Sequence, residues 1–383
     1  MSPIARCKLP IWLTVAATAL LFLIPVAGQA AKPTTDRAVE RGLERLVGAR
    51  GGPPGAIATL HRGGQTTVLR AGRADVMRRG KPRASDHMRI ASIAKAFSGA
   101  VALHLVEEGR LGLDDTIGQR LPSLPSSWAS VTVRQMLSHT SGLPDYTQSR
   151  GFAKQAESKP RGYVSPTGII DWVRRDDLVF RPGSRYEYSN TDNIVVGLIA
   201  EQVTGQSYGD LLRTLVFGPA GLTQTTFPTR RISLPKPYIH GYAVTPGQSP
   251  QDLTTFLSPS GAWASGAIVS TPADLGAFIR AYLGRRFFGA DQQREQLRFV
   301  RGASSPPGPG TNSAGLAIFR YRTRCGTVYG HTGNFPGYVQ WAAATADGTR
   351  SVTTSLNIPA PTGALLKQLR SVQASAVCAL LGK

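Results

Sequence analysis

The stretch "RIASIAKAFSGA", which runs from Arg89 to Ala100, places Lys95 inside a small and apolar run that is typical of a buried helix. A buried ammonium without partners is costly, so a lysine in such a place usually loses its charge or finds partners. Residues three apart on a helix share a face, so Lys95 can present its amine to the Ser92 hydroxyl. We predict that Ser92 is a nucleophile and that Lys95, its pKa lowered by desolvation, helps to deprotonate it. The alternative is a helix-packing serine beside a lysine whose amine reaches solvent.

The Ser-x-x-Lys spacing occurs a second time, from Ser233 to Lys236. Pro235 and Pro237 argue against a helix there, because proline lacks the N–H that a helix interior needs. We therefore assign the chemistry to the first copy.

A second polar cluster precedes another helical pattern. The stretch "RPGSRYEYSNTDN", from Arg181 to Asn193, puts Tyr188 and Asn190 in a turn. The phenol of Tyr188 is suited to move a proton, and the amide of Asn190 is suited to hydrogen-bond a substrate. The alternative for Asn190 is a cap on the helix that follows.

A third cluster lies late in the chain, in "YGHTGNFPGY" from Tyr329 to Tyr338. His331 and Thr332 can bind a carboxylate or assist a proton transfer. Gly333, which has no side chain, would let a substrate backbone approach an edge strand closely. The alternative is a strand with an ordinary, hydrogen-bonded histidine.

In this order, the three clusters resemble the motif set of the penicillin-recognising serine enzymes, which pairs S-x-x-K with two further short motifs. The Tyr-Ser-Asn form is similar to the branch that contains class C β-lactamases, exported D-alanyl-D-alanine carboxypeptidases and related esterases. The stretches "VTVRQMLSHTSGLPDY" (131–146) and "GAIVSTPADLGAFIRAYL" (266–283) agree with it. The resemblance covers the chain from about residue 55 to residue 357.

The resemblance implies that Ser92 attacks a carbonyl and becomes acylated. Lys95 and Tyr188 would then move the proton from Ser92 to the leaving group. The backbone N–H groups of Ser92 and Asn334 would form an oxyanion hole, which stabilises the charge that develops in the transition state. β-Lactams would act as covalent inhibitors.

The same resemblance implies a substrate-binding set. Asn190 would hold the substrate amide, and Thr332, with His331 and Gly333 beside it, would hold the carboxylate. Typical β-lactamases of this branch carry lysine in place of His331, and the histidine form is similar to secreted D-alanyl-D-alanine carboxypeptidases. An imidazole with an ordinary pKa of about 6.5 is only partly charged at neutral pH. The sequence shows no obvious acid that would prepare a water for fast deacylation, so we do not expect efficient β-lactam hydrolysis.

Strand patterns lie near both ends of the chain, and helical patterns lie between them. Two β-prone runs meet at Gly63-Gly64 and two more meet at Asp347-Gly348, a strong hairpin signal. A helical pattern capped by Thr35 precedes the first hairpin, and an amphipathic pattern from Gly363 to Leu381 ends the chain. We predict an α+β fold, as in β-lactamases and transpeptidases: an antiparallel β-sheet flanked by N- and C-terminal helices, with a mostly helical second lobe inserted.

The first 30 residues have the order of a secretory signal peptide. Arg6 and Lys8 precede an apolar run from Leu9 to Ala27, and small residues follow it. The alternative is an uncleaved membrane anchor. We therefore expect an exported protein, extracellular or associated with the cell wall, or anchored to the membrane if the signal stays attached.

We expect residues 31–383 to form a single catalytic unit. Residues 31–100 and 255–383 would make up its α/β lobe, and residues 101–254 its mostly helical lobe.

The formal net charge of +21 favours anionic polymers, such as a cell wall or a membrane face, as partners. The basic residues are scattered and no nucleic-acid motif accompanies them, so we expect no nucleic-acid partner. No histidine or cysteine spacing matches a metal site, and we expect neither a metal nor a cofactor. Beyond the signal, Cys325 and Cys378 can pair in an exported protein, and two separate thiols are the alternative.

These observations predict an exported serine hydrolase that acts through an acyl-enzyme, of the D-alanyl-D-alanine carboxypeptidase type, on peptidoglycan stem peptides or another acyl substrate. An esterase or a β-lactamase-like hydrolase of the same fold is the alternative among enzymes. A non-catalytic cell-wall-binding protein is the alternative from another class. The set of Ser92, Lys95 and Tyr188 argues against it, because a binding module needs no nucleophile with proton-transfer partners. The sequence does not predict the oligomeric state.

Overall fold

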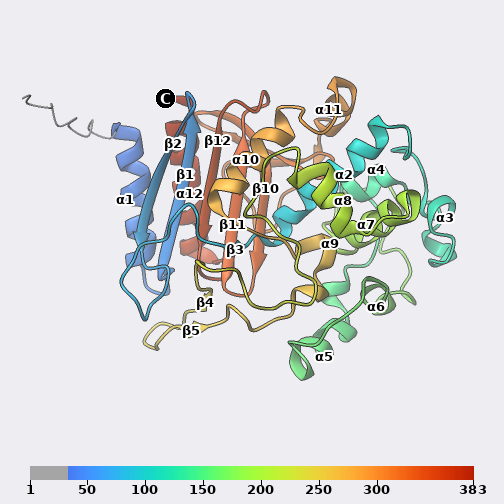
Figure 1. The fold of residues 1–383 in the computed structure, drawn as a ribbon, viewed down its shortest axis with the longest axis horizontal. Coiled ribbons are helices and arrows are strands. Elements are labelled where there is room, and N and C mark those ends of the chain that lie inside the picture. Colours follow the sequence, from blue (N-terminus) through green and yellow to red (C-terminus); the bar gives the residue numbers. More distant parts are fainter. Residues whose placement is uncertain (1–32) are drawn as a thin grey trace, which may run out of the picture. The chain divides into compact units, whose positions relative to one another are not determined.

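An eight-stranded sheet is the centre of the computed structural model, which describes residues 33–383 (Figure 1). Its strands lie in the order β2-β1-β12-β11-β10-β9-β8-β7, and each paired neighbour is antiparallel. Their bounds are β1 (Gly55–Arg62), β2 (Gln65–Gly72), β7 (Val300–Arg301), β8 (Thr311–Ala314), β9 (Phe319–Thr323), β10 (Gly326–Phe335), β11 (Tyr338–Ala344) and β12 (Ser351–Leu356). The early strand β1 pairs with the late strand β12, so both ends of the described chain build one sheet.

Two small sheets, twelve α-helices, four short 3₁₀ helices and one π-helical segment complete the described residues. The small sheets are β3 (Met88–Arg89) with β6 (Val269–Ser270), and β4 (Tyr242–Ala243) with β5 (Gln251–Asp252). The helices are α1 (Thr34–Gly48), α2 (Ala94–Glu107), α3 (Ile117–Arg120), α4 (Val133–Leu137), α5 (Arg150–Ser158), α6 (Pro166–Asp171), α7 (Thr191–Thr204), α8 (Tyr208–Leu211), α9 (Trp263–Gly266), α10 (Pro272–Leu283), α11 (Ala290–Gln296) and α12 (Gly363–Leu381). The predicted α+β class with its antiparallel sheet is confirmed.

Helices cover both faces of the sheet. The terminal helices α1 and α12 pack on each other and on one face, while α10 packs on the other (Figure 1). Successive residues of a strand point to opposite faces. Ala56 and Ala58 accordingly join the apolar cluster under α1 and α12, whereas Ile57 joins the cluster on the opposite face.

Both predicted hairpins are confirmed, and glycine makes their turns possible. Gly63 and Gly64 link β1 to β2 with φ of 56° and 76°, and Gly348 has φ of 68° in the turn from β11 to β12. A side chain disfavours this left-handed conformation. The helix predicted near Thr35 begins one residue earlier, and Pro33 takes the cap position without a side-chain bond, so the predicted cap by Thr35 is wrong. Proline suits this position because its φ is preset and it needs no N–H partner.

The helix α2 contains Lys95 and the second half of the stretch Arg89–Ala100. Every residue from Ala94 to Leu103 is buried, because α2 lies between the sheet side and the helices α7 and α9. A helix that is apolar on all sides is stable only in such an enclosed position. The predicted lobe boundary at residue 100 falls inside α2, and the β4–β5 pair lies within the segment predicted as mostly helical. The division into lobes stays a prediction.

The predicted signal peptide, residues 1–30, lies outside the described residues. Within residues 33–383, no helix combines the length and the apolar character needed to cross a membrane.

A disulfide joins Cys325, in the turn between β9 and β10, to Cys378 on α12. The bond ties the last helix to the sheet across 53 residues of sequence. Such a link restricts the unfolded chain far more than the folded one.

We expect the double substitution Cys325→Ser and Cys378→Ser to lower the free energy of unfolding by about 2–4 kcal/mol, because the unfolded chain regains the entropy of a closed loop. Denaturant unfolding of the purified protein measures this. Wild-type protein treated with a reductant should match the variant. Equal midpoints for oxidised wild type and variant would contradict the stabilising role of the bond.

Candidate active site

Ser92 lies in a short 3₁₀ turn, Ala91–Ile93, directly before α2. It opens into a cavity of about 670 Å³ that Tyr188, Asn190 and Asn334 also line. Three of the predicted clusters, which lie far apart in the sequence, therefore meet at one cavity. Their predicted catalytic roles stay predictions.

The chain makes a close contact behind the nucleophile. Ala91 has φ of 51°, a left-handed conformation that is costly for alanine. A Cβ on Gly333 would lie 2.3 Å from the Ile90 carbonyl oxygen and 3.1 Å from the Ser92 nitrogen. Gly333 thus lets β10 approach the turn that presents Ser92. The close approach is to the protein's own backbone, whereas the prediction was for the backbone of a substrate.

The end of β10 is open on one side. Its pairing with β9 stops at Gly330, whereas its pairing with β11 continues to Phe335. Residues 331–335 therefore have a strand on one side only, although β10 as a whole lies inside the sheet.

Lys95 is fully buried beneath Ser92 and has three polar partners. Its Nζ lies 3.1 Å from Ser92 Oγ, and it donates to Asn190 Oδ1 at 2.8 Å and to the Ser265 carbonyl oxygen at 2.9 Å. Burial lowers the pKa of Lys95 to about 7, against the opposing effect of Asp145 and Asp192. A neutral amine has two N–H groups, which the two carbonyl oxygens accept, and its lone pair then faces the Ser92 hydroxyl. The geometry suits Lys95 as the base.

Tyr188 keeps its proton at neutral pH. Burial raises its pKa well above the ordinary value, and a contact with the Ser92 hydroxyl offsets part of this. Within residues 33–383, Tyr188 Oη forms no hydrogen bond of regular geometry. The Lys95 nitrogen lies 5.1 Å from the ring centre. A protonated phenol at this place can donate to a leaving group but cannot be the first base.

Asn190 occupies the cap position of α7, but its side chain makes no capping bond. The amide instead donates to Asp145 Oδ2 at 3.0 Å while its oxygen accepts from Lys95. The alternative of a helix cap is therefore wrong, and the amide belongs to the site. Asp145 fixes which way the amide points, because a carboxylate can only accept.

His331 and Thr332 lie behind the cavity and do not line it. The His331 ring is buried against Phe319, and burial with the nearby Lys95 charge lowers its pKa well below 6.5. The hydroxyl of Thr332 donates to the Pro306 carbonyl oxygen at 2.8 Å. A positively charged His331 is thus no part of the site at neutral pH, and the predicted contact of this cluster with a substrate carboxylate stays a prediction.

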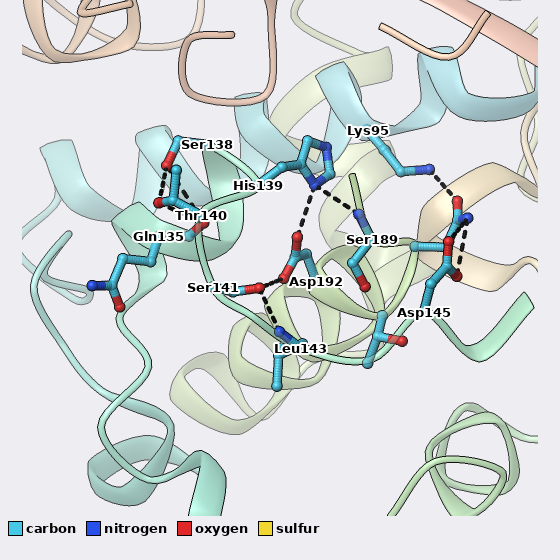
Figure 2. Close-up of polar contacts among 12 residues, drawn as sticks. Lys95, Gln135, Ser138, His139, Thr140, Ser141, Leu143, Asp145, Ser189 and Asp192 are labelled. Atoms are coloured by element: carbon cyan, nitrogen blue, oxygen red, sulfur yellow. Dashed lines mark hydrogen bonds and ion pairs between the residues drawn. The ribbon is translucent and has the colours of Figure 1, made fainter. Parts of the chain in front are cut away.

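Figure 2 shows a polar network that the sequence analysis did not assign. His139 Nδ1 lies 2.7 Å from Asp192 Oδ2, and Ser141 Oγ donates to Asp192 Oδ1 at 2.5 Å. The His139 ring packs on Tyr188 with centroids 4.3 Å apart. Burial lowers the pKa of His139 to about 3 and raises that of Asp192 well above its usual range, which keeps the pair neutral overall.

The network had a signal in the sequence. His139, Ser141 and Asp145 lie within seven residues of one quoted stretch, and Asp192 follows Asn190 by two. Polar residues so densely placed before apolar helices indicate a buried hydrogen-bonded cluster. The partner of each side chain could be read only from the fold.

The comparisons with known proteins agree with this arrangement. The family model described as Beta-lactamase matches residues 36–374. Among curated proteins, the chain is 29% identical to "Penicillin-binding protein 4*" of Bacillus subtilis over 264 residues, 65% of this chain and 56% of that protein. The chain thus spans about half the length of this curated relative.

Two solved structures cover nearly the whole described chain. A D-stereospecific amidohydrolase from a Streptomyces species has a TM-score of 0.78 at 28% identity, with 91% of this chain and 99% of that chain covered. The D-amino acid amidase from Ochrobactrum anthropi, complexed with L-phenylalanine amide, has a TM-score of 0.78 at 26% identity and the same coverage.

We expect the covalent labelling of Ser92 by a neutral fluorophosphonate to rise with pH and to level off above a midpoint near 7. Lys95, with its pKa of about 7, must lose its proton before it can act as a base, so the rate should fall about tenfold per pH unit below about 6. His139 and His331 titrate lower and do not contribute. A rate that is flat from pH 6 to 8, measured by mass spectrometry, would exclude Lys95 as the base.

We expect Gly333→Ala to slow the same labelling about 100-fold, because the new methyl group would push β10 away from the Ser92 turn and small displacements are costly in catalysis. Gly48→Ala is the control, since a Cβ there meets nothing within 4 Å. Thermal unfolding should show that both variants fold. A labelling rate equal to that of wild type would show that the close approach is dispensable.

Proposed function

The chain belongs to the beta-lactamase family and is a serine hydrolase with the fold of β-lactamases and penicillin-binding proteins. We propose that it hydrolyses an amide bond next to a D-amino acid through an acyl-enzyme on Ser92. One observation carries the proposal. A buried lysine with a pKa of about 7 lies 3.1 Å from a serine hydroxyl that opens into a large cavity.

The proposed reaction has two steps. Ser92 Oγ bonds to the substrate carbonyl carbon while Lys95 takes its proton. The C–N bond breaks as Tyr188 donates its proton to the leaving nitrogen, and the proton held by Lys95 then moves to Tyr188. Water then bonds to the ester carbonyl carbon while Lys95 takes one of its protons. The bond between that carbon and Ser92 Oγ breaks, Lys95 returns the proton to Oγ, and the carboxylic acid leaves. The backbone N–H groups of Ser92 and Asn334 are our candidates for stabilising the negative oxygen in both steps.

The carboxypeptidase form of this activity, on D-alanyl-D-alanine ends of peptidoglycan stem peptides, requires a group that binds the C-terminal carboxylate. Penicillin-binding protein 4* among the relatives supports this form. Within residues 33–383, however, no lysine or arginine lines the cavity, and His331 is neutral and buried. Hydroxyl and backbone donors alone would have to hold the carboxylate.

The amidase form is the second candidate, and a specific observation favours it. An amide substrate carries no carboxylate at the scissile bond, so the absence of a cation from the described cavity lining costs it nothing. Two neighbours in the comparison of structures are a D-stereospecific amidohydrolase and a D-amino acid amidase. We rank this form above the carboxypeptidase form.

We also propose that the protein is exported. The N-terminal pattern of residues 1–30 supports this, and so does the disulfide between Cys325 and Cys378, because such bonds persist in oxidising compartments. The net charge of +21 would then attract the protein to anionic wall polymers.

An esterase or a β-lactamase-like enzyme would use the same acyl-enzyme, and a non-catalytic wall-binding protein would need none.

A substrate panel separates these alternatives. The amidase form predicts turnover of D-alaninamide, and the carboxypeptidase form predicts release of D-alanine from a peptide ending in D-Ala-D-Ala. The esterase form predicts p-nitrophenyl acetate as the best substrate, and the β-lactamase-like form predicts opening of nitrocefin. A wall-binding protein would hydrolyse none of them.

We expect Ser92→Ala to abolish turnover of every acyl substrate and covalent labelling by a penicillin, while the protein stays folded, because no other group occupies the place of the attacking oxygen. Ser233→Ala is the matched control, since Ser233 is exposed and begins the second Ser-x-x-Lys sequence. Intact-mass spectrometry reports the adduct. Turnover that survives in Ser92→Ala would refute the proposed function.

A further inference from the structure

The cavity in front of Ser92 adjoins a second, smaller one of about 170 Å³. The two share Asp145, Gln148, Glu187 and Tyr188 in their walls, and we refer to the two adjoining cavities together as the Asp145 groove. Leu143, Val173 and Val179 form the apolar side of the smaller part. A substrate that reaches Ser92 therefore lies beside the wall that the two cavities share.

The charge of the Asp145 groove is opposite to that of the protein. Its walls carry the carboxylates of Asp145, Glu187 and Asp176, and no lysine or arginine of residues 33–383 lines either part. The whole chain has 44 lysines and arginines against 23 aspartates and glutamates. Acidic walls in so basic a chain indicate a site that selects positive charge.

The three carboxylates differ in the hydrogen bonds and ion pairs that they already form. Asp145 lines the cavity, and its Oδ1 accepts from the backbone N–H and the hydroxyl of Thr147 and from the Asn190 amide. Among the described residues, its Oδ2 accepts from the Asn190 amide alone. Glu187 is exposed and pairs with Arg185 at 2.8 Å. Asp176 is exposed and forms no ion pair with a described residue. Asp145 and Asp176 thus supply most of the available negative charge.

Asp145 is also close to the reacting bond. It is connected to the Ser92 hydroxyl through Asn190 and Lys95, each contact being 3.1 Å or shorter. A positive group held at Asp145 would therefore lie only a few bonds from a carbonyl carbon at Ser92.

We propose that the Asp145 groove binds an ammonium group of the acyl part of the substrate, so that the enzyme acts on D-aminoacyl compounds with a free amine. This inference rests on the proposed function and names its substrate class. The carboxylates attract the ammonium and repel a carboxylate at the same place, so N-acylated and anionic substrates lose this contact.

The test compares three substrates with a different charge at the amine end: cationic D-alanine p-nitroanilide, its neutral N-acetyl derivative and its anionic N-succinyl derivative. Because the substituents also differ in size, the salt dependence and the groove variants report the part due to charge. Near neutral pH we expect kcat/KM to fall in that order, by about tenfold or more from the first to the third, since interactions between close charges near a surface reach this size. The preference should shrink as salt is added, because salt screens exposed charges.

Variants of the groove test its origin. Asp176→Asn and Glu187→Gln should each lower the ratio of kcat/KM for the free amine to that for the succinyl compound by about 2- to 5-fold. Arg185→Gln should raise it, because it frees the Glu187 carboxylate. Asp177→Asn is the matched control, an exposed neighbour that lines neither cavity and should leave the ratio unchanged. Asp145 is left intact because it also orients Asn190.

Two outcomes would overturn the inference: equal kcat/KM for the three compounds, or a preference for the succinyl derivative. If none is turned over, the same compounds are compared as competitors of fluorophosphonate labelling, and the free amine should protect Ser92 best. Labelling itself is scored separately. Its absence would refute the proposed function, whereas labelling without any preference for the amine would refute only the Asp145 groove as an ammonium site.

Discussion

The burial of one lysine nitrogen organises this structure. Lys95 lies in a helix that is enclosed on all sides, where an unpaired charge would cost several kcal/mol. Its three partners come from the Ser92 turn, from the start of α7 and from α9, up to 170 residues away in the sequence. Because no single segment can satisfy Lys95, the sheet side and the helices must be docked before this nitrogen is accommodated. The same enclosure brings its pKa near 7, so the cost of burial and the proposed basicity have one cause.

A further layer of hydrogen bonds holds the partners of Lys95 in place. Asp145 orients the amide of Asn190, and the His139–Asp192 pair packs behind the ring of Tyr188. Buried polar networks of this kind are stabilising only when each member is paired. The segment 139–145 and the start of α7 are therefore linked by hydrogen bonds, and we expect a substitution in one of them to affect the other.

The contrast between a basic chain and an acidic groove has a physical basis in screening. At physiological ionic strength, an exposed charge acts over about 8 Å, so a net charge of +21 spread over the surface does not decide the potential inside a cleft. The few carboxylates in the walls decide it. The proposed attraction to wall polymers and the proposed ammonium site in the groove are therefore compatible.

The sequence by itself determined the class of fold, both glycine hairpins and the pairing of Ser92 with Lys95, because turn chemistry and helical spacing act over a few residues. It also marked the stretches that contain Tyr188 and Asn190. Only the tertiary structure decided that the Asn190 amide turns to Lys95 and does not cap α7, that His331 is buried and neutral, and that carboxylates line the groove. These properties depend on which distant segments pack together, since burial and partner choice set the charge and the orientation of a side chain.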